Sequence, residues 1–110
     1  MTSNRTGSTF PNGKQKRYAL FPVQGFVENP LSYVGNRYRI KGRLDNVLES
    51  AGTGETMKRL VSLAVGDGKF IPVLVPSSSA TFDIQKEQGI VVYCMVTADG
   101  LPVAEQIQKE

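Results

Sequence analysis

Residues 36–44, NRYRIKGRL, place a basic side chain at every second position. These basic residues are Arg37, Arg39, Lys41 and Arg43. A period of two puts successive side chains on opposite faces of a β-strand, whereas a helix would scatter the same charges around its circumference. The segment therefore predicts a strand with a basic row on one face and Tyr38, Ile40 and Leu44 buried on the other. Like charges in a row repel each other, so the row indicates either an anionic ligand or a solvated strand face that discourages edge pairing.

The composition argues against catalysis and against a metal site. The chain has 110 residues, enough for one domain with a core, but it contains one cysteine, Cys94, and no histidine. Zinc sites and histidine-based triads need those residues, and the carboxylates show no spacing that marks out a catalytic pair. We therefore expect a non-enzymatic protein without metal or cofactor. A lone cysteine, no signal-peptide h-region and no apolar run near ~20 residues favour a cytoplasmic protein away from membranes.

The charge is distributed unevenly along the chain. Residues 1–43 hold eight Lys or Arg and one acid, a net charge of +7, whereas residues 44–110 hold five basic and nine acidic residues, a net charge of −4. Such asymmetry indicates a basic surface that faces a polyanion. A solvated basic tail is the alternative.

Three regions follow from the composition along the chain. Residues 1–17 are polar and basic without an apolar period, so we expect a disordered basic arm. Residues 18–35 carry aromatic residues but also two prolines and two glycines, which predicts a segment that docks on the barrel or forms a short edge strand. Residues 36–110 make up the folded barrel.

Five segments have the length and alternation of strands. They are residues 36–49, 57–65, 69–75, 90–97 and 101–108. Glycine-containing tight turns are expected at 66–68 and 98–100, and residues 76–89 form a connector with at most one or two helical turns.

The alternation also assigns faces to these strands. Phe70 has the opposite parity to its apolar neighbours Ile71 and Val73, so it should point outward from its strand. In the last strand, the residues expected on one side are Leu101, Val103, Glu105 and Ile107. Strand 90–97 is apolar on both faces, and its outward residues are Val91, Tyr93 and Met95. This outward set needs a cover, either residues 18–35 or another subunit.

The chain resembles the OB-fold family over about residues 36–109. The resemblance lies in a long first strand with a central glycine (RIKGRLDNVLE), the hairpin 57–75, a connector that ends in glycine before an apolar strand (IQKEQGIVVYCMV), and a final hairpin (DGLPVAEQIQK). Within that fold the chain is most similar to small single-strand-binding proteins of the primosomal replication and filamentous-phage types. The resemblance implies an all-β, five-stranded Greek-key barrel in which Gly42 bends the first strand so that it pairs with two neighbours.

The resemblance also implies a ligand surface across the second and third barrel strands. Single strands are bound by a positive groove and by aromatic side chains that stack on bases. The candidate binding residues are Arg37, Arg39, Lys41, Arg43, Lys58, Arg59 and Phe70 in the barrel, with Lys14, Lys16 and Arg17 in the arm. Phe70 has two alternative roles, stacking on bases or packing under the N-terminal segment. For Tyr18, Phe21 and Phe26 the alternatives are binding nucleic acid together with the arm and packing on the barrel.

The expected function is non-catalytic binding of single-stranded nucleic acid, DNA ahead of RNA, with low sequence specificity. A homo-oligomer is possible. The alternative is a protein-interaction module whose basic face meets an acidic partner within a larger complex.

Overall fold

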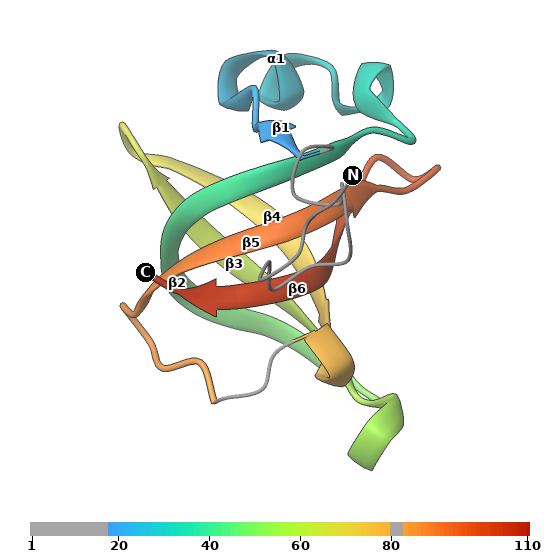
Figure 1. The fold of residues 1–110 in the computed structure, drawn as a ribbon, viewed down its shortest axis with the longest axis vertical. Helices are drawn as coiled ribbons and strands as arrows, with labels where there is room; N and C mark the ends of the chain where they lie inside the picture. The colour runs from blue at the N-terminus through green and yellow to red at the C-terminus, as the bar shows by residue number, and fades with distance from the viewer. Residues whose placement is uncertain (1–17, 80–82) are drawn as a thin grey trace, which may run out of the picture.

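Five long strands form a closed barrel in the computed structural model, which describes residues 18–79 and 83–110 (Figure 1). The barrel strands are β2 (Arg37–Ala51), β3 (Lys58–Gly66), β4 (Lys69–Pro76), β5 (Gly89–Val96) and β6 (Pro102–Lys109). The shorter elements are β1 (Ala19–Leu20), α1 (Val23–Glu28) and three 3-10 turns, η2 (Pro30–Tyr33), η3 (Gly54–Thr56) and η4 (Ser77–Ser79). Each barrel strand begins and ends within two residues of the bounds predicted from the sequence.

The strand order confirms the predicted all-β, OB-like barrel. The sheet runs β1-β2-β3-β4-β6-β5, and an additional antiparallel pairing of β2 with β5 closes it. β4 and β6 are parallel and meet at Leu74 and Val103, whereas the other barrel pairs are antiparallel. The Greek-key crossing therefore lies in the connector between β4 and β5.

Gly42 lies where β2 changes partner. β2 pairs with β5 through residues 37–43 and with β3 through residues 43–51, so it curves around the barrel, as Figure 1 shows. A Cβ at Gly42 would lie 2.5 Å from the carbonyl oxygen of Ala64 on β3. The bend predicted at this glycine is present, and the two backbones approach so closely there that a side chain at residue 42 would not fit.

The barrel interior follows the predicted alternation in β2 to β5. The fully buried side chains of these strands are Ile40, Leu63, Ile71, Val73, Ile90, Val92, Cys94 and Val96. Each belongs to the inward parity of its strand, because inward and outward positions alternate. Away from the register shifts in β2 and β3, the residues between these buried positions lie on the outer side of the barrel.

The alternation predicted for β6 is wrong. Pro102 and Ala104 are buried together with Ile107, whereas Glu105 is exposed. The register shifts at this point, since Tyr93 pairs with Gln106 and the next residue, Cys94, pairs with Ala104. Glu105 is thus the extra residue of a β-bulge, which changes the parity of the strand and turns the carboxylate outward.

Residues 18–35 pack on the barrel beside β2. β1 pairs in parallel with β2 at Tyr38 and Arg39, and α1 and η2 follow it at one end of the barrel (Figure 1). The rings of Phe21 and Phe26 lie 4.9 Å apart, and Phe21 meets the Tyr38 ring edge-on at 5.5 Å. These aromatic residues therefore extend the barrel core toward its end.

Tyr18 covers the outward face of β5. Its ring lies 5.2 Å from that of Tyr93 in an edge-to-face arrangement, and Val91 packs against this pair. Tyr18 and Tyr93 are both buried, with 3% and 9% of their surface exposed. The N-terminal segment of the chain thus covers the outward side chains of Tyr93 and Val91, as the first of the two alternatives predicted.

Candidate nucleic-acid interface

The outer surface of β3 and β4 is uncharged over most of its length, and we call it the β3–β4 face. It consists of Leu60, Ser62 and Ala64 on β3 and Phe70, Pro72 and Leu74 on β4. These residues alternate with the buried positions of the same two strands and pair directly across them. The side chains are small or apolar, and they form a surface without charges of its own.

Phe70 is the large aromatic residue of this face. Phe70 is 52% exposed in the described structure, so about half of its surface is open to a ligand. Phe70 pairs with Ala64 on β3, and Ala64 pairs with Arg43 on β2. A guanidinium and an exposed ring therefore lie in one cross-strand row on either side of a methyl group. Neighbouring strands are about 4.8 Å apart, so the two Cα atoms are separated by roughly 10 Å.

Several cations near this face have no side-chain partner among the described residues. Within residues 18–79 and 83–110, Arg43, Lys58 and Arg59 make no ion pair or side-chain hydrogen bond. Lys58 has the same parity as Ala64 but lies six residues away at the other end of β3. Arg59 is the second residue of β3; it has the inward parity but is exposed. Arg43 and Lys58 thus border the β3–β4 face at its two ends.

The other three cations of the basic row are engaged within the chain. Arg37 forms a salt bridge with Glu105 at 3.1 Å, and Lys41 forms one with Glu110 at 2.9 Å. The Arg39 guanidinium donates to the backbone carbonyl of Tyr18 at 3.2 Å. This part of β2 pairs with β5, so it lies away from β4. The row is a continuous strand face, but its charges are partly neutralised up to Lys41 and uncompensated at Arg43.

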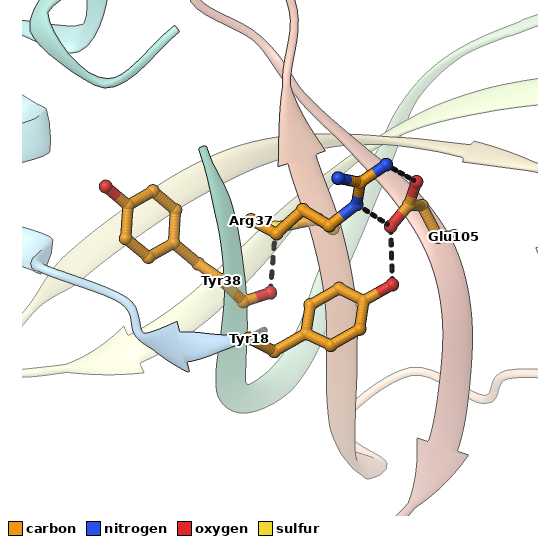
Figure 2. A network of polar contacts seen from close by, with 5 residues as sticks. Tyr18, Arg37, Tyr38 and Glu105 are labelled. Atoms are coloured by element: carbon orange, nitrogen blue, oxygen red, sulfur yellow. Dashed lines mark hydrogen bonds and ion pairs between the residues drawn. The ribbon is translucent and has the colours of Figure 1, made fainter. Parts of the chain in front are cut away.

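Glu105 is the centre of a polar network that joins β6, β2 and the N-terminal segment. Figure 2 shows its carboxylate between the Arg37 guanidinium and the Tyr18 hydroxyl, which donates to it at 2.5 Å. Burial, and then the hydrogen bond to the Glu105 carboxylate, raise the pKa of Tyr18 to about 12. The same carboxylate raises the pKa of Arg37 through its hydrogen bond. No role was predicted for Glu105 from the sequence. Its predicted place on a face with Leu101, Val103 and Ile107 was nevertheless unusual for a carboxylate and indicated a break in the alternation.

The remaining predicted site residues have no structural placement. Lys14, Lys16 and Arg17 lie outside the described residues. The described chain continues from Tyr18, beside the outer surface of β5 and β6, and not beside the β3–β4 face.

The described residues contain no cluster of three or more histidine, cysteine or acidic residues that could hold a metal ion. Cys94 is buried in the barrel interior, and burial raises the pKa of its thiol to about 12. At neutral pH this thiol is protonated, and the thiolate is the form that reacts. In the same part of the chain, no helix has the length and apolar character needed to cross a membrane.

A scan against models of known protein families finds no match for this chain. A search of curated proteins likewise finds no significant relative.

Proposed function

We propose that this protein binds single-stranded nucleic acid without catalysis and with low sequence specificity, and that the strand lies across the β3–β4 face. The observation that carries the proposal is the row formed by Phe70, Ala64 and Arg43. A half-exposed phenylalanine offers a base a stacking surface. An arginine that has no side-chain partner among the described residues offers its donors to a phosphate. The methyl group of Ala64 leaves room for the sugar between them.

The chemistry of this face favours an unpaired strand over a duplex. Stacking on Phe70 requires a base whose face is free, and bases in a duplex are already stacked on their neighbours. The only described α-helix, α1, has six residues and no basic side chain, so a helix in a major groove does not fit. Every base has an aromatic face, which makes stacking tolerant of sequence. DNA is the first ligand to test, and RNA the second.

A fluorescence-anisotropy titration with labelled oligothymidylate, oligouridylate and a DNA duplex tests this proposal. We expect the single strands to bind more tightly than the duplex, and we expect the affinity to fall with salt because phosphate contacts release counterions. Phe70→Ala should weaken binding by ~1–3 kcal/mol with little change in the salt slope. Arg43→Gln should flatten the plot of log affinity against log salt by roughly 0.7. Equal binding of duplex and single strand would contradict the proposal.

A protein-interaction module is the second candidate, and exposed apolar residues favour it. Leu20, Val27 and Leu31 are 70%, 52% and 62% exposed, and all three lie in the N-terminal segment that packs beside β2. An apolar interface responds weakly to salt, whereas phosphate contacts respond strongly. Lack of binding to any oligonucleotide, together with recovery of a protein partner whose affinity is insensitive to salt, would favour this candidate.

A further inference from the structure

The carboxylate of Glu110 occupies part of the basic row on β2. Its Oε2 atom lies 2.9 Å from the Lys41 ammonium, and its backbone N–H donates to the carbonyl oxygen of Gly89 at 3.1 Å. A Cβ added at Gly89 would collide with Oε1 of the same carboxylate. An anionic group therefore already lies on this surface, in a space that exists because residue 89 has no side chain.

The surface beside the basic row carries little side-chain bulk where Glu110 lies on it. Gly89 pairs with Arg43, and the half-buried Val91 pairs with Lys41. Arg43 also pairs with Ala64 on the other side, so it borders both this surface and the β3–β4 face. A path along the outside of the barrel thus leads from Phe70 across Ala64 to Arg43, and from there along β2.

We propose that a bound nucleic-acid strand turns at Arg43 and continues along β2 toward Arg39, and that a phosphate replaces the Glu110 carboxylate on Lys41. This inference rests on the proposed function and adds to it the direction of the strand and an internal competitor. Carboxylate and phosphate oxygens accept the same charge-assisted hydrogen bonds from a lysine. Glu110 therefore weakens binding to strands long enough to reach Lys41.

The exposure of the two salt bridges decides where this path ends. The side chains of Lys41 and Glu110 are 68% and 44% exposed, so solvent screens their attraction and a phosphate displaces the carboxylate at small cost. Arg37 and Glu105 are less exposed, and Tyr18 also donates to Glu105. That pair stays closed, so the strand contacts Arg39 but leaves the Arg37 salt bridge intact.

The geometry predicts a length at which Lys41 begins to contribute. Two strand spacings separate Phe70 from Arg43, roughly 10 Å, and four residues separate Arg43 from Arg39, roughly 13 Å. A stacked strand advances ~3.4 Å per nucleotide, so the first part of the path holds about three nucleotides and the whole path about seven.

Affinity measured with two lengths of labelled oligothymidylate, about three and about twelve nucleotides, tests the path. Lys41→Gln should weaken binding of the long strand by about 1.5- to 5-fold and leave the short strand unchanged, and Glu110→Gln should tighten binding of the long strand by a similar factor. In the Lys41→Gln background, Glu110→Gln should have no further effect beyond its change in net charge. Glu28→Gln in α1 is the control for that charge change. Its effect on binding should be small at both lengths.

The other outcomes would contradict the path along β2, the competition at Lys41, or the proposed function itself. If Lys41→Gln and Glu110→Gln change the binding of both lengths equally, or of neither, while wild-type protein binds, the strand does not follow β2 and this inference fails alone. If Glu110→Gln acts to the same extent without Lys41, the carboxylate does not compete at that ammonium. If neither length binds to wild-type protein, the proposed function fails and this inference fails with it.

Discussion

Replacing Gly42 with alanine tests the cause of the bend in β2. The new Cβ would lie 2.5 Å from the carbonyl oxygen of Ala64 and 3.1 Å from Cγ of Leu63. Ordinary contacts of a Cβ begin near 3.4 Å, so β2 and β3 would have to separate by almost 1 Å, the difference between 3.4 and 2.5 Å. The oxygen belongs to backbone within a paired strand, and it cannot move aside without loosening the ladder at Arg43 and Ala64.

The magnitude follows from two opposing effects. Overpacking of a rigid site costs about 1–3 kcal/mol of the free energy of unfolding. Loss of the glycine's freedom in the unfolded chain returns about 0.4–1 kcal/mol, since the φ angle of Gly42 is not in the left-handed region. Taken at the middle of both ranges, the net destabilisation is about 1–1.5 kcal/mol. For a domain of this size it lowers the melting temperature by roughly 4–8 °C.

Thermal denaturation followed by circular dichroism measures this effect. Ser50→Ala is the matched control, because Ser50 is an exposed residue of the same strand, and its substitution should change stability by less than about 0.5 kcal/mol. Gly42→Val should be more destabilising than Gly42→Ala, because it adds two further methyl groups at the same contact. A Gly42→Ala variant as stable as wild type would refute the argument that backbone proximity requires glycine.

Three further predictions concern the polar network, the basic row and the core. Folding raises the pKa of Tyr18 from 10.0 to about 12 and so favours its neutral form. The stability that this shift supplies is complete below pH 10 and is lost as the pH rises toward 12. Urea denaturation at alkaline pH should therefore show a smaller loss of stability in Tyr18→Phe than in the wild-type protein. Arg37→Gln should lower the melting temperature and barely affect oligonucleotide binding, because Arg37 is held by Glu105. Arg43→Gln should weaken oligonucleotide binding and barely affect the melting temperature. Weaker binding in Arg37→Gln would show that the salt bridge opens for the ligand. Cys94 should react with a thiol reagent only after unfolding in urea, since burial raises the pKa of the thiol to about 12, and rapid reaction of the native protein would show that the barrel opens locally.

Local features of the sequence predicted the strands, and the resemblance to OB-folds implied that they close into a barrel. The alternation of polar and apolar residues fixed the inward faces of four strands, because a strand has only two faces. The turn at 66–68 was predicted by its two glycines, and all three of its residues have positive φ, Gly66 at 99°, Asp67 at 54° and Gly68 at 71°. The bend at Gly42 was implied by the resemblance to OB-folds, which place a central glycine in a long first strand. Each of these signals lies within a few residues of the feature that it specifies.

The candidate site was predictable only in part. Parity placed Phe70 outside, and the exposed ring agrees with that prediction. Parity could not show which cations of the basic row are already paired. Arg37 and Glu105 are 68 residues apart in sequence, and the bulge in β6 that aims Glu105 outward reverses the alternation on which the sequence argument depends.

The sequence by itself therefore determined which residues form strands, which side of most strands is buried, and that one strand presents a basic row. The tertiary structure decided how those charges are used. Barrel closure brings Glu105 and Glu110 next to Arg37 and Lys41. It places Arg43 across Ala64 from Phe70, where no acidic side chain of the described residues pairs with it. The physical reason is that period and parity are local properties of one strand. Ion pairing depends on which strands become neighbours, and on the one-residue bulge that sets their register.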